Sequence, residues 1–155
     1  MQTEKPNPAT DPGRGRRLGL DVGTVRIGVA ISDPDCILAT PVETIQASAD
    51  DADVQRVVEI CEENFVVEIV VGLPVALRGN HTQSTVNAEE FARLVKEALP
   101  DIPVRMVDER MSTMAATQAF HASGVNSKKG RKKIDQAAAV HILQGWLDTR
   151  RRALS

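Results

Sequence analysis

Apolar and polar positions in the first third of the chain follow a pattern that predicts three β-strands. The strands are expected at 17–21, 26–32 and 37–45. The gap between the first two is short enough for an antiparallel hairpin. Pro41 interrupts the third strand, and proline is tolerated mainly at sheet edges, so this strand is predicted at an edge.

Helical spacing of apolar residues then alternates with further strand-like runs. One helix is expected to begin after Ser48, and three more are expected at 86–99, 112–123 and 134–150. The run at 65–71 is almost wholly apolar, as in a strand that is covered on both faces, and 104–107 is a fifth strand. This order predicts an α/β fold, a mixed five-stranded sheet flanked by helices on both faces.

Length and composition indicate one domain. The chain has 155 residues, 42% of them hydrophobic, which is enough to build a single core. The polar segment 1–16 is expected to be a disordered lead, 17–150 the domain and 151–155 a short basic tail. No apolar stretch is long enough to span a bilayer or form the core of a signal peptide, so a cytoplasmic location without a membrane partner is expected.

Cys36 and Cys61 are the only cysteines. Two cysteines are too few for a disulfide framework, and they lack metal-ligand spacing, so free, packed thiols are expected. A second hypothesis places Cys36 on the surface near the edge strand, where oxidation would crosslink two subunits.

Charge is divided unevenly along the chain. Residues 1–104 hold 9 basic and 17 acidic residues, whereas 105–155 hold 10 basic and 4 acidic ones. The basic part contains a cationic loop directly before Asp135, formed by Lys128, Lys129, Arg131, Lys132 and Lys133. A local positive field of this kind is suited to a phosphate backbone, so these side chains are predicted to bind nucleic acid. Arg150, Arg151 and Arg152 are expected to be solvated.

Three acidic positions stand at the ends of predicted elements. Asp21 closes the first strand, Asp108 and Glu109 follow the fifth, and Asp135 lies on the last helix. On that helix Asp135 shares a face with the apolar residues that pack against the sheet, which are Ala138, Ala139, Ile142 and Trp146. Alternation sends Asp108 and Glu109 to opposite faces of the strand, so both remain candidates. Converging carboxylates of this kind are suited to Mg²⁺ or Mn²⁺.

Four motifs resemble the YqgF family, also called RuvX-like, in their order and spacing. They are LGLDVGTVRIGVAISD at 18–33, VVGLP at 70–74 with Gly79 downstream, VDER at 107–110 with Ser112 and Thr113, and IDQAAAVHILQGWL at 134–147. The family is similar to the RuvC resolvases and belongs to the ribonuclease H-like superfamily. The resemblance therefore implies a ribonuclease H-like fold over about residues 18–147.

The resemblance also implies an activity. The expected protein is a metal-dependent nuclease in the 5′-end maturation of pre-16S rRNA, with Holliday junction resolution as the alternative. Its partners would be precursor rRNA or branched DNA, with the ribosome or pre-ribosome as a further partner. Two ions, Mg²⁺ or Mn²⁺, are expected; Asp21 would bridge them, while Asp135 and one of Asp108 or Glu109 would each hold one. RuvC itself has a carboxylate at the end of the fourth strand, where this chain has Val71-Gly72-Leu73-Pro74.

Arg26 and Arg110 are the further candidates for phosphate contacts, because a guanidinium fork matches phosphate oxygens. The alternative for each is a structural ion pair. The three histidines, His81, His121 and His141, are scattered and are expected to be surface or packing residues.

Two readings from other functional classes remain. One is a non-catalytic RNA- or ribosome-binding module in which the acids are structural. The other is an ATPase of the actin, hexokinase and Hsp70 group, because residues 21–33 resemble the first phosphate loop of these proteins. Those ATPases need two domains and a second Gly-rich loop. A resolvase requires a symmetric homodimer, whereas an rRNA nuclease can act as a monomer.

Overall fold

The computed structural model of the chain describes residues 3–74, 83–108 and 128–155, and within 128–132 it describes the backbone. The predicted helix at 112–123 lies outside these residues. Each strand predicted from the pattern is found within two residues of its expected bounds. The strands are β1 (Arg16–Val22), β2 (Arg26–Ser32), β3 (Ala39–Gln46), β4 (Val66–Leu73) and β5 (Val104–Asp108).

The strands form one mixed sheet in the order β3-β2-β1-β4-β5. β1, β2 and β3 pair antiparallel, and β4 and β5 follow β1 in parallel. The register of β3 on β2 shifts between Val29 and Ala30, opposite Pro41, as expected for an irregular edge strand. The predicted α/β class and the edge position of the third strand are confirmed.

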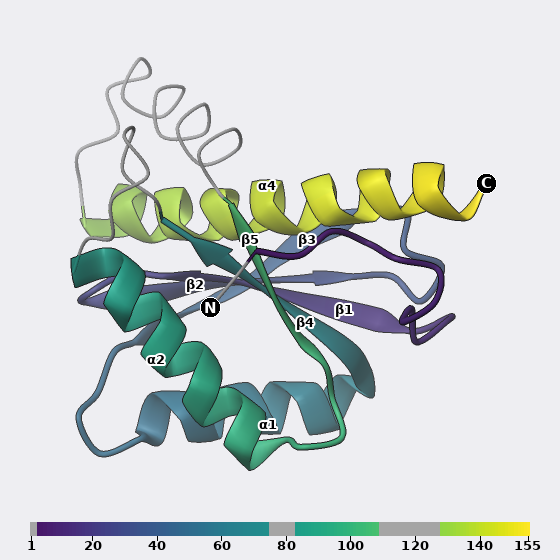
Figure 1. Cartoon of the computed structure of the whole chain (residues 1–155). Coiled ribbons are helices and arrows are strands. Elements are labelled where there is room, and N and C mark those ends of the chain that lie inside the picture. The colour runs from purple at the N-terminus through teal and green to yellow at the C-terminus, as the bar shows by residue number, and fades with distance from the viewer. Residues whose placement is uncertain (1–2, 75–82, 109–127) are drawn as a thin grey trace.

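Helices cover both faces of the sheet. α1 (Ala52–Asn64) and α2 (Gln83–Ala98) lie on one face, and the long helix α4 (Lys128–Leu154) crosses the other (Figure 1). α1 buries Val54, Val57 and Cys61, which recur at helical spacing. β4 is the strand buried on both faces, as its continuous apolar run predicted.

Strand alternation separates two cores. Leu18, Leu20 and Val22 of β1 belong to the core shared with α1 and α2. Gly19 instead lies beneath Leu143 of α4. Because side chains alternate between faces, Asp21 is directed to the α4 face.

Glycines allow α4 to lie very close to the strands. A Cβ atom on Gly28 would stand 2.0 Å from the carbonyl oxygen of Asp135, and one on Gly19 would stand 2.7 Å from Cβ of Leu143. The facing residues Ala138 and Ala139 of α4 are small and fully buried. The backbone of α4 therefore rests on β1 and β2 with few side-chain atoms between them.

An ionic cluster is buried between α4 and the sheet near the amino end of β1. Glu68 accepts hydrogen bonds from Arg17 Nε at 2.9 Å, Arg105 Nε at 3.0 Å and Trp146 Nε1 at 3.0 Å. The side chains of Arg17 and Glu68 are 0% and 1% exposed. β1, β4, β5 and α4 thus each supply one side chain to this cluster around the buried carboxylate of Glu68. The sequence patterns did not predict it.

The amino-terminal lead is fixed to this cluster. Asp11 accepts hydrogen bonds from Arg17 Nη2 at 3.2 Å and Arg150 Nε at 2.7 Å. The backbone N–H of Glu4 donates to the carbonyl of Met106 on β5. In the structure residues 3–15 therefore lie along the rest of the protein, although their polar composition predicted disorder. Composition does not reveal these contacts, because the partners are charged and backbone groups far along the chain. The predicted tail also differs, since α4 continues to Leu154.

Replacing Gly28 by alanine is expected to lower the free energy of unfolding by about 3 kcal/mol, because the new methyl group would meet the α4 backbone. Urea unfolding of the full chain measures this loss. Gly145→Ala is the matched control: Gly145 is exposed on α4, where alanine is the better helix former, so stability should be unchanged or slightly raised. Equal stability of wild type and Gly28→Ala would contradict the close packing.

Asp11→Asn is expected to cost about 3 kcal/mol at pH 7, since Arg150 and Arg17 would lose a charged partner. Burial raises the pKa of Asp11, but hydrogen bonds from Arg150 and Gly13 and the charges of both arginines outweigh it, so this pKa lies below its ordinary value. A lowered pKa stabilises the fold above pH 4, and this contribution disappears as the pH falls through the folded-state value.

The difference in unfolding free energy between wild type and Asp11→Asn should therefore shrink as the pH is lowered from 7 to 3. Urea unfolding at both pH values measures it. A difference that stays constant would show that the charge of Asp11 contributes nothing.

Candidate carboxylate site

The candidate site lies at the carboxyl end of β1, against the start of α4. Asp21 pairs in register with Gly28 on β2. Gly28 in turn contacts the backbone of Asp135 on α4. Asp21 and Asp135 therefore flank the same glycine on the same face of the sheet. Asp135 lies on the side of α4 that packs against the sheet, as its helical spacing predicted.

Arg26 joins this pair of carboxylates. It precedes Ile27, which points into the opposite core, so Arg26 is directed to the α4 face. Its Nε donates to Oδ2 of Asp135 at 2.7 Å, and the two side chains are 24% and 21% exposed. Of the two predictions for Arg26, the ion pair is the one present in this structure.

Two further contacts hold these residues in place. The N–H of Gly23 donates to the carbonyl of Arg26 at 2.9 Å and closes the turn between β1 and β2. Gln136 Nε2 donates to Oγ1 of Thr44 on β3 at 3.0 Å, which fixes α4 next to Asp135. The turn between β1 and β2 and the start of α4 are thus both held by hydrogen bonds next to the two carboxylates.

Asp108 is the last residue of β5 and is half-buried, with Leu73 as its register partner. Its neighbour Val107 packs against the α4-side core, whereas Met106 lies in the other one. Glu109 and Arg110 lie outside the described residues. Within the described residues, no group of three or more His, Cys, Asp or Glu side chains is arranged to hold a metal ion.

The basic run before Asp135 belongs to α4. Its backbone is helical from Lys128, six residues before the predicted start at 134, so the expected cationic loop is corrected to the first turns of a helix. Lysine and arginine are good helix formers, but they leave no apolar periodicity to mark a helix start. The side chain of Lys133 is exposed, and those of Lys128, Lys129, Arg131 and Lys132 are outside the description.

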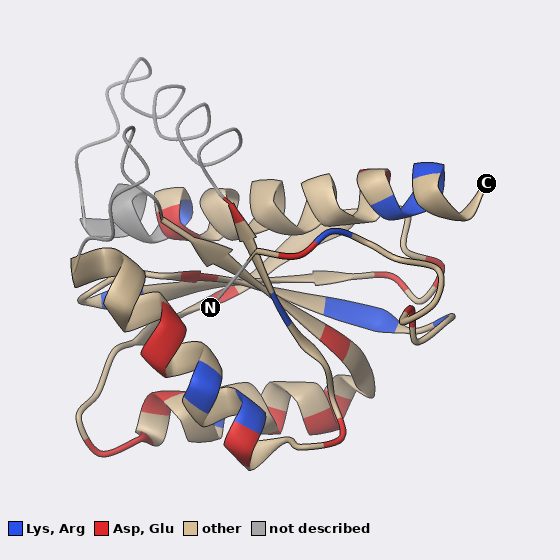
Figure 2. Ribbon diagram, in the orientation of Figure 1, with Lys and Arg blue, Asp and Glu red and all other residues tan. Residues whose placement is uncertain are grey.

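The other end of α4 is also basic (Figure 2). Arg150 is nevertheless 14% exposed and bound to Asp11, so the prediction that it is solvated is wrong. Arg151 and Arg152 are exposed as expected. His141 is exposed on α4, which agrees with a surface role, whereas His81 and His121 lie outside the described residues.

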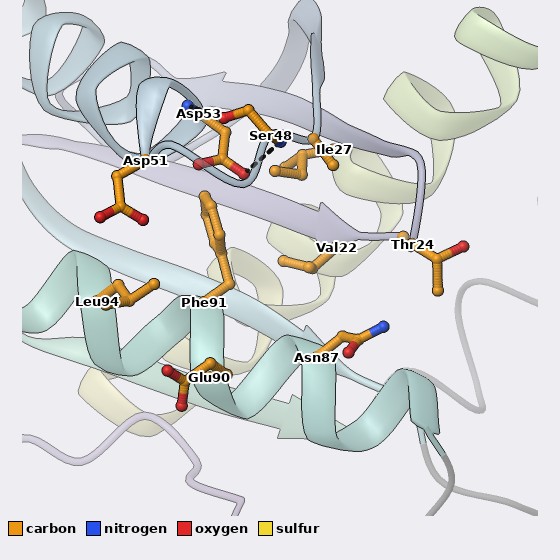
Figure 3. A pocket seen from close by; sticks show the side chains of 12 residues that line it. Val22, Thr24, Ile27, Ser48, Asp51, Asp53, Asn87, Glu90, Phe91 and Leu94 are labelled. Atoms are coloured by element: carbon orange, nitrogen blue, oxygen red, sulfur yellow. Dashed lines mark hydrogen bonds between the residues drawn. The ribbon is translucent and has the colours of Figure 1, made fainter.

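A cavity of about 240 Å³ opens on the opposite face of the sheet (Figure 3). It lies between the turn after β1, the start of α1 and α2. Ser48 and Asp53 close one wall, since the N–H of each donates to the side chain of the other. Its described lining includes three acidic residues, Asp51, Asp53 and Glu90, and no Lys or Arg, so it does not suit a phosphate backbone.

Asp33 is a turn residue that follows β2. It accepts hydrogen bonds from the N–H groups of Ile37 and Leu38, both at 2.8 Å, which is the role of a turn residue. Burial raises its pKa, but these backbone hydrogen bonds outweigh that effect and hold the pKa below its ordinary value.

The cysteines are both free and buried, as their number predicted. Cys36 is 3% exposed, and Arg17 Nη1 donates to its Sγ at 3.0 Å. The hypothesis of an exposed, crosslinking Cys36 is therefore wrong, because the ionic cluster folds the lead and the segment after β2 over the thiol.

Within the described part of the chain, every helix is too short or too polar to cross a membrane.

Comparison with known proteins identifies relatives of this chain. A family model described as "RuvX: Holliday junction resolvase" matches residues 15–149. A protein of Corynebacterium jeikeium (strain K411) named "Putative pre-16S rRNA nuclease" is 95% identical over 155 residues, covering 100% of both chains. A protein of the same name from Corynebacterium glutamicum is 58% identical over 153 residues, covering 93% of this chain and 84% of that protein.

The fold is also found among solved structures. RuvC of T. thermophilus in complex with a Holliday junction substrate superposes with a TM-score of 0.60 at 18% identity, covering 90% of this chain and 97% of that chain. The free T. thermophilus RuvC structure gives a TM-score of 0.54 at 16% identity. These matches confirm the predicted ribonuclease H-like fold.

Both thiols are expected to react slowly with a disulfide reagent such as DTNB in the native protein, because burial raises the pKa of Cys36 and raises that of Cys61 to about 12. Unfolding in guanidinium should expose two fast-reacting thiols. A stoichiometric burst from the native protein, or a disulfide-linked dimer on a non-reducing gel, would contradict this burial.

Proposed function

The chain belongs to the RuvX family, and on that premise we propose that it is a metal-dependent nuclease that hydrolyses phosphodiester bonds during 5′-end maturation of pre-16S rRNA. The observation that carries this proposal is the placement of Asp21 and Asp135 on one face, on either side of Gly28. The names of its relatives in Corynebacterium support rRNA as the substrate.

The donor set fits a hard divalent cation. Carboxylate oxygens are the ligands that Mg²⁺ and Mn²⁺ prefer, and Asp21 and Asp135 are only partly buried, so solvent and ions reach them. When bound, the metal supplies activation of a water molecule and stabilisation of the leaving oxygen. Asp21 and Asp135 would hold the metal ions.

Glu109 is the better candidate than Asp108 for the third ligand. Asp108 is the last residue of β5, and Val107 before it packs toward α4. Asp108 has the parity of Met106, whose side chain lies in the core with α1 and α2. Asp21, Glu109 and Asp135 are thus the proposed metal ligands.

The first turns of α4 are proposed to bind the phosphate backbone. Their basic residues precede Asp135 on the same helix, so the substrate would be guided to the carboxylates. The set is Lys128, Lys129, Arg131, Lys132 and Lys133, together with Arg110. Aromatic residues make up only 3% of the chain, so recognition is assigned to backbone and shape rather than base stacking.

A precursor of the small ribosomal subunit is the proposed partner, and the cytoplasm the proposed location. One copy of the chain is sufficient for cleavage of a single strand. Holliday junction resolution is the alternative, favoured by the description of the family model. It requires two such sites in a symmetric dimer.

Asp21→Asn is expected to reduce metal-dependent cleavage by a factor on the order of 100 or more, because even outer partners of metal ligands are worth 10- to 100-fold. Cleavage of precursor 16S rRNA and of a four-way DNA junction is measured side by side with Mg²⁺ or Mn²⁺. Asp35→Asn is the matched control, since Asp35 is an exposed carboxylate paired with Arg14.

Cleavage of the rRNA by wild type and Asp35→Asn, but not by Asp21→Asn, is the predicted outcome. Cleavage of the junction alone would assign the protein to resolution. Binding of RNA without cleavage by any of the three proteins would favour a non-catalytic module.

A further inference from the structure

The ion pair between Arg26 and Asp135 occupies a residue that the proposed function assigns to metal binding. Arg26 Nε lies 2.7 Å from Oδ2 of Asp135, which is a short, charge-assisted hydrogen bond. This contact uses one of the carboxylate oxygens that would otherwise be offered to a cation. The guanidinium therefore neutralises Asp135 in the structure as it stands.

The backbones that carry the two side chains are fixed, whereas Arg26 itself is accessible. Asp135 is held against Gly28, and the next residue, Gln136, is bonded to Thr44 on β3. Arg26 begins β2 directly after a turn, and its side chain is 24% exposed. A rearrangement here requires only a change of side-chain rotamer at Arg26.

The arginines elsewhere on this face differ from Arg26. Arg17 is 0% exposed and binds Glu68, Asp11 and the carbonyls of Gly13 and Gly15. Arg105 is 13% exposed and binds Glu68, Glu4 and the carbonyl of Thr10. These arginines are structural, since moving either would remove one of the charged partners of the buried Glu68.

We propose that Arg26 is the resident counter-ion of the carboxylate site, that a divalent cation displaces it from Asp135, and that the released guanidinium then binds a phosphate oxygen of the substrate. This inference rests on the proposed metal-dependent function. Both predictions for Arg26, an ion pair and a phosphate contact, then apply to successive states of one side chain. The exchange keeps Asp135 paired before the metal binds and adds a cation next to the substrate afterwards.

Metal binding without substrate tests the first half. Isothermal titration of the full chain with Mn²⁺ compares wild type, Arg26→Gln and the control Arg14→Gln. Arg14 is 72% exposed, pairs with Asp35 and precedes β1, at the end of the strand opposite to Asp21. Because Arg26→Gln removes a competitor for Asp135, it should bind Mn²⁺ about fivefold more tightly than wild type, whereas Arg14→Gln should match wild type.

Thermal melting gives a second readout. Without metal, Arg26→Gln should melt at a lower temperature than wild type, because Asp135 lacks its partner, and saturating Mn²⁺ should close that gap. If wild type binds no Mn²⁺, the proposed function fails. If wild type binds Mn²⁺ and Arg26→Gln binds it equally or more weakly, the displacement of Arg26 is refuted.

RNA binding tests the second half. Affinity for precursor 16S rRNA is measured without metal and with Ca²⁺, an oxygen-preferring cation. Arg26→Gln should weaken binding with Ca²⁺ several-fold and leave metal-free binding almost unchanged. An equal loss under both conditions would show that Arg26 contacts RNA regardless of metal and would overturn the exchange.

Should Arg26→Gln not fold, the wild-type protein still decides. The Nε–H signal of Arg26 in a ¹H–¹⁵N spectrum should shift and exchange faster with solvent when Mg²⁺ is added. An unchanged signal at saturating Mg²⁺ would overturn the proposal.

Discussion

The close packing of α4 on β1 and β2 is the contact on which the rest of the structure depends. Gly19 and Gly28 have no side chains to separate the sheet from the helix, and the facing residues Ala138 and Ala139 have only methyl groups. The helix backbone thereby touches β2 at the level of Asp21. Asp135 on the helix and Asp21 on the strand therefore both lie next to Gly28, because this layer is missing.

The opposite end of α4 is fixed by charge rather than by small residues. Trp146 binds Glu68, which also holds Arg17 and Arg105, and Arg150 binds Asp11 of the lead. A buried ionic cluster costs desolvation and gains stability only when every member is satisfied. The members of this cluster are buried, whereas the ion pair between Arg26 and Asp135 at the candidate site is partly exposed.

Sequence patterns predicted the features that depend on local periodicity. The strands, the edge position of β3 and the face of α4 that carries Asp135 all follow from the spacing of apolar residues. The ionic cluster was missed because Glu68 and Arg17 stand 51 residues apart, and no local pattern links them. The placement of the lead depends on that cluster and was missed with it, whereas the burial of both thiols was expected from their number. Glu68 within an otherwise apolar strand was the one available signal.

A crystal of the full chain grown with Mn²⁺ and examined by anomalous diffraction tests the central claim most directly. We expect the manganese signal between Asp21 and Asp135, beside Gly28, with the guanidinium of Arg26 turned away from Asp135. Manganese bound instead among Asp51, Asp53 and Glu90 on the opposite face, with Arg26 still on Asp135, would contradict the assignment of the site.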